Sequence, residues 1–287
     1  MHHIKGADMA NAGMRWQRWV AIAAVAGASG FVVGGCTTTT TTTTSATGAS
    51  YASEPVVTPS DESEVRRRAR IRLELAANYF QMGQTTVALD EVKQSIAHDP
   101  TFADAHHLMA LIYMRLGNLV QAEEGLRRAQ ALRPGDPDIM HNFGWLQCQR
   151  QRYAESMQWF DRALAVPAYT SRSKTLMSQG VCLERSGDLT AAEQVLLRAY
   201  ELDAGSPVIG YGLASLKFRR GDAKQAQFYV RRVNNGEFAS AESLWLGIKV
   251  ERALKDTIAM RQLGEQLRKR FPDSRELLAY ERGAFDE

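Results

Sequence analysis

The sequence predicts an all-α fold: a right-handed superhelical solenoid of about twelve antiparallel helices, preceded by a disordered tether. Three observations predict it. Residues 62–272 have a helical pattern with Gly and Pro at regular breaks, six segments of this region repeat with a period near 34 residues, and a Thr/Ser-rich stretch precedes them. A fixed period of this length is typical of stacked helical repeats, in which each unit buries its apolar face only against its neighbours.

Composition and charge limit the class of protein. With 45% hydrophobic and 23% charged residues among 287, most of the chain is not disordered, and only one apolar stretch approaches spanning length. The net charge of +3 comes largely from residues 1–35, which hold three basic residues and one acidic residue. The remaining 32 basic and 31 acidic residues nearly cancel. Such a balance argues against nucleic-acid binding, which needs concentrated positive charge.

The N-terminus has the pattern of an export signal. Arg15 and Arg18 precede an uncharged segment rich in Ala, Val and Gly, which is too short to span a membrane. The segment ends in Val33-Gly34-Gly35-Cys36, which resembles the bacterial lipobox and implies that Cys36 becomes a lipidated mature N-terminus. Thr37, where retained lipoproteins have Asp, favours the periplasmic face of the outer membrane by the same resemblance. The alternative is an ordinary signal anchor with an incidental Cys.

We therefore divide the chain into three parts. Residues 1–35 are a signal peptide with an upstream extension, and the lipobox covers residues 33–36. Residues 36–63 contain an unbroken run of eight Thr followed by Ser, Ala, Gly and Pro, and they form the expected disordered tether. Residues 64–287 form the repeat array.

The six repeats start near residues 69, 103, 137, 173, 207 and 240, and they share small residues at two positions. Position 8 holds Ala76, Ala110, Gly144, Gly180, Ala214 and Gly247, and position 20 holds Ala88, Ala122, Ser156, Ala192, Ala226 and Ala259. Small side chains there allow two antiparallel helices to approach closely. Position 24 is large and apolar, and in four repeats a Gly at position 15 ends the first helix.

This pattern resembles the tetratricopeptide repeat, with Tyr79 and Tyr113 at its position 11 and Tyr153 at position 17. The resemblance implies a concave groove lined by the first helix of each pair, mainly at positions 2, 5, 9, 12 and 13. Solenoids of this kind bind extended peptides or helices. The rule selects eight candidate groove residues, for each of which ordinary core packing is the alternative: Leu73, Ala77, Phe80, His107, Leu111, Met114, His141 and Trp145.

Signs of catalysis are few. Cys148 and Cys182 lie one repeat apart on adjacent first helices, which in an exported protein favours a disulfide over two buried free thiols. His107 and His141 share position 5, where a groove histidine serves as a polar contact more often than as a ligand. Cysteines without a histidine cluster do not make a zinc site. We expect no enzyme activity, no metal, no cofactor and no small-molecule substrate.

Several short segments indicate which family of repeat lipoproteins this chain resembles. The segments Ala69–Ala76, His141–Cys148, Leu244–Gly247 and Gln266–Pro272, with Gly180-x-Cys182, resemble the PilF/PilW family of type IV pilus lipoproteins over residues 64–276. That family often has Asn where His141 stands and Tyr where Phe143 stands. The resemblance implies a pilotin, an outer-membrane lipoprotein that binds pilus secretin subunits and promotes their localisation and multimerisation, and thereby twitching motility.

Two other functions stay open. A repeat lipoprotein can bind and regulate periplasmic cell-wall enzymes through the same groove. An outer-membrane protein assembly factor is also a repeat lipoprotein, although that class typically has fewer repeats than six.

Overall fold

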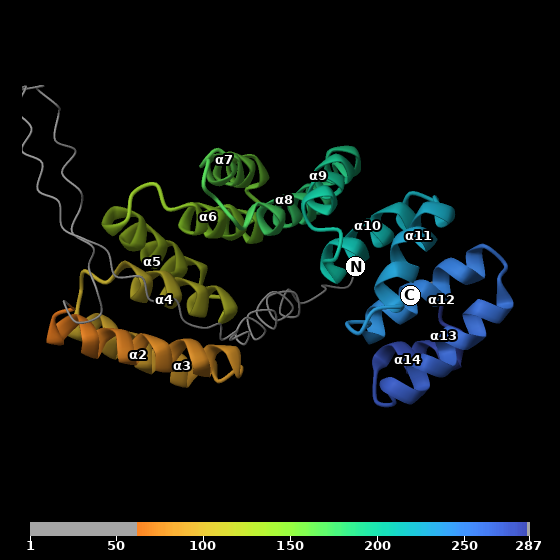
Figure 1. Ribbon diagram of the computed structural model, residues 1–287, viewed down its shortest axis with the longest axis horizontal. Coiled ribbons are helices and arrows are strands. Elements are labelled where there is room, and N and C mark those ends of the chain that lie inside the picture. Colours follow the sequence, from red (N-terminus) through yellow and green to blue (C-terminus); the bar gives the residue numbers. More distant parts are fainter. Residues whose placement is uncertain (1–61, 286–287) are drawn as a thin grey trace, which may run out of the picture.

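The computed structural model describes residues 62–285, which form thirteen helices and no strand (Figure 1). The predicted signal peptide, Cys36 and the tether up to residue 61 lie outside the described residues. The helices are α2 (Glu64–Gln81), α3 (Thr85–His98), α4 (Ala103–Arg115), α5 (Leu119–Leu132), α6 (Pro137–Gln149), α7 (Tyr153–Leu164), α8 (Arg172–Ser186), α9 (Leu189–Leu202), α10 (Pro207–Arg219), α11 (Ala223–Asn234), α12 (Ala241–Ala253), α13 (Thr257–Arg270) and α14 (Arg275–Arg282). Within residues 62–285, none of these helices is both long enough and apolar enough to cross a membrane.

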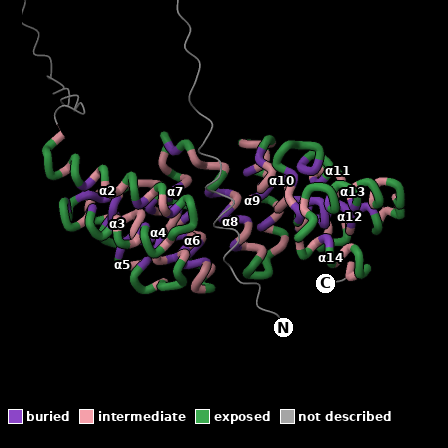
Figure 2. Tube along the Cα trace, turned by 90° about the horizontal axis from the view of Figure 1, so that it is seen from below, coloured by how far each residue is buried: buried purple, intermediate pink, exposed green. Residues whose placement is uncertain are grey.

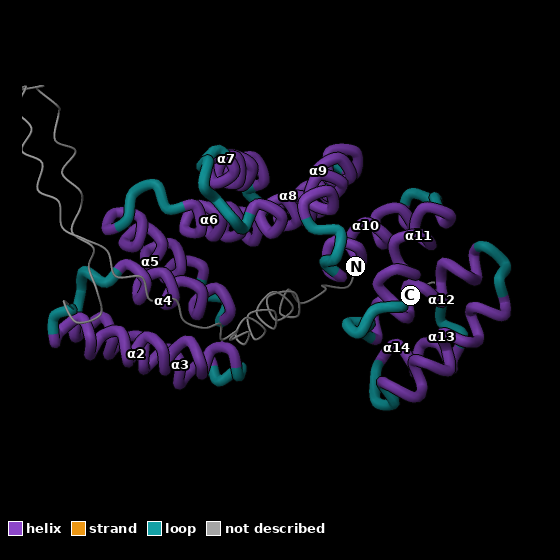
Figure 3. The backbone as a smooth tube through the Cα atoms, in the orientation of Figure 1, coloured by secondary structure: helices purple, strands orange, loops and turns teal. Residues whose placement is uncertain are grey.

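The helices form six pairs, from α2–α3 to α12–α13, and α14 covers the end of the last pair (Figure 1). Each first helix also contacts the first helix of the next pair, so α2, α4, α6, α8, α10 and α12 follow the inner side of a curved solenoid. Short loops join the helices (Figure 3), and buried residues run along the middle of the stack (Figure 2). The predicted all-α solenoid of six helix pairs is confirmed.

Close packing within each pair explains the small residues of the repeat. A Cβ atom on Gly144 would lie 2.6 Å from the ring of Phe160, and one on Gly180 would lie 2.6 Å from Leu196. Each is a contact between positions 8 and 24 of the same repeat. In repeat three the Ser156 hydroxyl, at position 20, donates a hydrogen bond of 2.7 Å to the carbonyl of Gly144. The small side chains therefore set the distance between the two helices of a pair.

The first helix of every repeat ends at a residue in the left-handed conformation. Gly occupies this position in four repeats, at Gly83, Gly117, Gly187 and Gly221, with φ between 76° and 92°. Gln151 and Lys255 adopt the same conformation in repeats three and six, with φ of 61° and 63°. Left-handed backbone is favourable for Gly and unfavourable for residues with a Cβ atom. Both residues are exposed, and their backbone N–H groups donate hydrogen bonds of 3.0 Å to the carbonyls of Cys148 and Arg252.

The left-handed conformation of Lys255 indicates that repeat six starts later than the sequence predicts. If the left-handed residue is position 15, repeat six begins at Ala241, one residue later than predicted, which is also where α12 begins. Position 8 is then Ile248 and position 24 is Gly264. Gly247 takes position 7, where a Cβ atom would lie 2.6 Å from Asn234 of the previous repeat and 3.1 Å from Leu263. Tyr280 of α14 fills the space above Gly264, where a Cβ atom would lie 2.4 Å from the ring. The sequence pattern followed Gly247 and therefore placed the repeat one residue early.

A disulfide joins the third and fourth repeats. Cys148 of α6 and Cys182 of α8 are bonded at 2.00 Å, with their Cα atoms 5.8 Å apart, and both side chains are buried beside Phe160. The bridge spans the place where the repeat spacing is 36 residues rather than 34. A disulfide that closes a loop of this size stabilises a fold by about 2–4 kcal/mol, chiefly by restricting the unfolded chain.

We expect Gly144→Ala to lower the melting temperature, because the added Cβ overlaps the Phe160 ring and overpacking costs about 1–3 kcal/mol. The matched control is Gly212→Ala on α10, where the nearest atoms of Leu196 lie 3.9 and 4.0 Å away. That change gains about 0.5–1 kcal/mol, because Ala favours a helix over Gly. Thermal unfolding followed by circular dichroism compares the two variants, and a higher melting temperature for Gly144→Ala would contradict the packing argument.

We expect the double variant Cys148→Ala/Cys182→Ala to lose about 2–4 kcal/mol of unfolding free energy in urea titrations under oxidising conditions. Reductant should weaken the wild type and leave the variant unchanged, since only the wild type contains the bond. An equal effect of reductant on both proteins would show that the bridge does not contribute to stability.

Candidate functional site

The inner side of the solenoid carries a row of half-buried side chains that we call the concave strip. Position 9 of the first five repeats supplies Ala77, Leu111, Trp145, Val181 and Ser215, and position 5 adds Leu73, His107, Met177 and Tyr211. All nine are partly accessible, and most are apolar. Because they come from successive first helices, they lie one repeat apart along the inner side of the solenoid.

The concave strip ends at repeat six. There the position 5 residue is Trp245, which is only 8% exposed because the ring of Phe285 stacks on it at 5.4 Å. The ammonium of Lys249, at position 9, lies 5.5 Å from the centre of the Trp245 ring. The segment after α14 thus covers the part of α12 that corresponds to the open strip on the earlier helices.

The structure separates the eight predicted groove residues into two groups. Leu73, Ala77, His107, Leu111 and Trp145 lie in the concave strip and are partly accessible. The prediction is wrong for Phe80, Met114 and His141, which are 3%, 8% and 4% exposed and belong to the interior.

Position 12 explains two of the three errors. Its side chains turn from the concave surface toward the next repeat. Phe80 lies under the guanidinium of Arg115, which is 3.9 Å from the ring centre and also donates a hydrogen bond of 2.9 Å to the Phe80 carbonyl. Met114 packs in the core cluster that contains Ile139 and Phe143.

His141 takes part in a buried hydrogen-bond network between repeats three and four. Its Nδ1 atom lies 2.9 Å from the hydroxyl of Thr175, which lies 2.7 Å from the hydroxyl of Tyr169. Burial lowers the pKa of His141 to about 3, and burial raises the pKa of Tyr169 to about 12. Both groups are therefore neutral near pH 7, and His141 joins two repeats rather than contacting a ligand.

Polar groups interrupt the apolar strip at two places. Asn142 of α6 donates a hydrogen bond of 2.6 Å from Nδ2 to Nε2 of His107 on α4. Burial lowers the pKa of His107, which fits this acceptor role because the ring stays neutral. The guanidinium of Arg185, an exposed residue of α8, lies 5.2 Å from the centre of the Trp145 ring. A partner therefore meets apolar side chains with isolated hydrogen-bonding groups and an accessible cation at Arg185.

Several strip residues were missing from the prediction. Met177, Val181, Tyr211 and Ser215 occupy positions 5 and 9 of repeats four and five, so applying the same rule further along the chain finds them. Arg185 is at position 13 and follows from the rule as well. Asn142 is at position 6, and only its contact with His107 reveals it.

The described residues do not contain a group of three or more His, Cys, Asp or Glu side chains that could hold a metal ion. Three of the described histidines are engaged in other contacts: His106 bonds to the carbonyl of Pro100 at 2.9 Å, and His107 and His141 bond as stated above. The arrangement suits recognition of a protein segment, in which apolar contacts supply affinity and a few polar groups fix orientation.

We expect the wild type to lose stability faster than His141→Asn as the pH falls from 6.5 toward 3. Unfolded His141 binds a proton below its ordinary pKa of 6.5, whereas the folded form binds one only near pH 3. Protonation of this histidine therefore stabilises the unfolded state by roughly 1.4 kcal/mol for each pH unit below 6.5 in this window. Above pH 6.5 this group does not change the stability. Urea unfolding of both proteins across the window measures the difference in slope, and identical slopes would contradict the assignment.

Comparison with known proteins agrees with this architecture. Tetratricopeptide repeat models match residues 79–137 and 174–207. The type IV pilus assembly protein PilF of Pseudomonas aeruginosa is 24% identical over 204 residues, which are 71% of this chain and 81% of PilF. A solved structure of the Pseudomonas aeruginosa PilF shares the fold, with a TM-score of 0.64 at 23% identity, and the match covers 77% of this chain and 100% of the solved chain.

The crystal structure of PilW, a widely conserved type IV pilus biogenesis factor, is 30% identical to this chain and has a TM-score of 0.67. The match covers 76% of this chain and 99% of the solved PilW chain. This chain therefore belongs to the PilF/PilW family of tetratricopeptide repeat proteins of type IV pilus biogenesis.

Proposed function

We propose that this protein is a lipid-anchored scaffold of the outer membrane that binds subunits of the type IV pilus secretin through its concave strip. In this role it promotes the localisation and multimerisation of the secretin without catalysis. The observation that carries the proposal is the concave strip itself, a row of accessible and mostly apolar side chains from five successive first helices on a member of this family.

The geometry of the strip supports capture of a protein segment. Side chains from five successive first helices face one side, so a helix or extended peptide laid along the strip contacts several repeats at once. Trp145 and Leu111 supply the large apolar contacts, and Arg185 supplies a charge next to the Trp145 ring. Aromatic and Arg side chains contribute most of the binding energy in many protein interfaces.

The anchor is the part of the proposal that rests on the sequence alone. Acylation of Cys36 would hold the chain on the membrane, since several acyl chains bind far more firmly than one. About 27 residues separate Cys36 from the start of α2 at Glu64. A flexible linker of that length has a root-mean-square reach of roughly 30 Å, enough for the array to meet a subunit beside the membrane.

A photo-crosslinking amino acid in place of Trp145 or Arg185 should capture the secretin in cells, because both residues lie in or beside the concave strip. The same amino acid in place of Gln94 on α3 or Arg198 on α9 should capture little or none, because these exposed residues lie on second helices. Mass spectrometry of the adducts identifies the partner.

Two results would overturn the proposal. One is deletion of the gene without loss of secretin multimers. The other is adducts from Trp145 and Arg185 that contain a penicillin-binding protein and no secretin, which would favour the cell-wall function instead. Capture of secretin from all four positions alike would reject the concave strip as the binding surface and leave the partner unchanged.

A further inference from the structure

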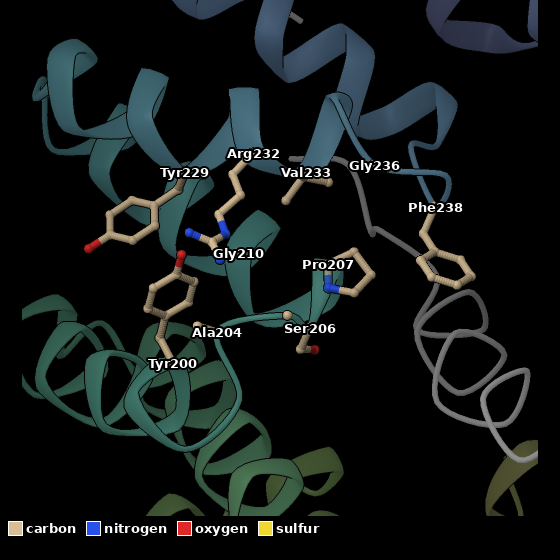
Figure 4. A pocket seen from close by; sticks show the side chains of 11 residues that line it. Tyr200, Ala204, Ser206, Pro207, Gly210, Tyr229, Arg232, Val233, Gly236 and Phe238 are labelled. Atoms are coloured by element: carbon tan, nitrogen blue, oxygen red, sulfur yellow. The ribbon is translucent and has the colours of Figure 1, made fainter. Parts of the chain in front are cut away.

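A small pocket lies at the edge of the solenoid, where the C-terminal end of α9 meets the N-terminal end of α10 and the C-terminal end of α11 (Figure 4). No residue of the concave strip lines it. Its volume is about 110 Å³, well below the roughly 300–1,000 Å³ of small-molecule sites. The pocket therefore has room for one side chain rather than for a cofactor.

The walls of the pocket are mostly aromatic and apolar. The rings of Tyr200 and Tyr229 meet edge to face at 5.3 Å, and Pro207 and Phe238 line the opposite side (Figure 4). Phe238 is 55% exposed. The floor is Gly210, where a Cβ atom would lie 2.8 Å from Val233. Such a surface favours a flat or branched apolar group.

The polar groups at this pocket are hydrogen-bond donors. The buried hydroxyl oxygen of Tyr200 has no hydrogen-bond partner, and leaving such a group unpaired is unfavourable. Arg232 makes no ion pair or hydrogen bond with any described residue, whereas the neighbouring Arg231 pairs with Glu251 at 2.7 Å. Figure 4 shows the Arg232 guanidinium and the Tyr200 hydroxyl directed toward the same space.

Arg232 and the N-terminal end of α10 supply positive charge at the pocket, and the carboxylate of Asp203 lies beside the lining residue Gly205. The N-terminal end of α10 opens here at Ser206 and Pro207, and the helix dipole adds partial positive charge at that end. No Asp or Glu is among the residues that line the pocket. The group that would complement this pocket is therefore an anionic hydrogen-bond acceptor directly beside an apolar group.

We propose that this pocket binds the C-terminal residue of a partner polypeptide. The apolar side chain of that residue packs against the rings of Tyr200, Tyr229 and Phe238, and its carboxylate accepts hydrogen bonds from Arg232 and Tyr200. A guanidinium binds a carboxylate through two parallel hydrogen bonds. A C-terminal residue carries a carboxylate and an apolar side chain on the same Cα atom, which matches a pocket of this size. Asp or Glu supplies the carboxylate without a separate apolar group.

The test uses the mature chain and a set of fluorescent Gly/Ser peptides that differ only in their last residue. Fluorescence anisotropy should show binding that is strongest for peptides ending in Phe, Leu or Ile as free acids. The same peptides with an amidated C-terminus should bind at least about tenfold more weakly, because they lose a charge-assisted contact with Arg232. A peptide ending in Ala should also bind more weakly, because it leaves the aromatic walls uncovered.

Matched variants assign the effect to the pocket. Arg232→Gln should weaken binding of the free acid about tenfold or more, and Tyr200→Phe, which removes only the hydroxyl, should weaken it about threefold or more. Arg198→Gln removes an exposed charge of α9 outside the pocket lining and should leave binding unchanged. Equal melting temperatures for the variants and the wild type exclude loss of fold as the cause.

Several outcomes would reject the proposal. They are equal binding of acid and amide, wild-type affinity in Arg232→Gln and Tyr200→Phe, and no binding of any free acid. Equal binding of an amidated peptide with an internal Glu would instead identify a site for acidic side chains. Crosslinking from Trp145 and Arg185 does not depend on these results, so failure of this proposal and failure of secretin binding can be told apart.

Discussion

The distance between the two helices of each pair is the constraint on which the rest of this structure depends. A small residue at position 8 lies under a large one at position 24, so close in Gly144 and Gly180 that a single added carbon atom would overlap the neighbouring side chain. This spacing fixes the rotation of each first helix, and the rotation determines which positions reach solvent. Repeat six departs from this pattern: Gly264 stands at position 24, and Tyr280 of α14 fills the space beside it.

The concave strip is a consequence of that rotation. Position 9, and position 5 in all of the first five repeats except at His141, reach the inner side. Position 12 turns toward the next repeat and is covered there, as Arg115 covers Phe80. The buried contacts between repeats, such as His141 with Thr175 and Cys148 with Cys182, then hold successive first helices at a fixed offset. A long partner segment meets a rigid row of side chains rather than six independent units, so little ordering is needed when it binds.

Much of the architecture can be read from the sequence, because the period, the small residues and the Gly stops are local signals that recur six times. What sequence reasoning missed depends on contacts between side chains far apart in the chain. Gln151 and Lys255 carry no sequence signal for a left-handed conformation, and the packing of Gly264 depends on Tyr280 from a helix beyond the repeat. The burial of His141 requires Thr175 from the next repeat and Tyr169 from the loop before it. The pocket at Tyr200 and Arg232 combines three helices with no shared motif.

The stacking of Phe285 on Trp245 makes the two ends of the solenoid unequal. At repeat six the row of accessible side chains stops beneath the segment that follows α14, whereas at repeat one α2 still exposes Ile71, Leu75 and Met82 to solvent. A chain lying on the inner surface therefore meets a closed end and an open end. The solenoid thus has a built-in polarity along its inner surface: the row of side chains is covered at α12 and stays accessible at α2.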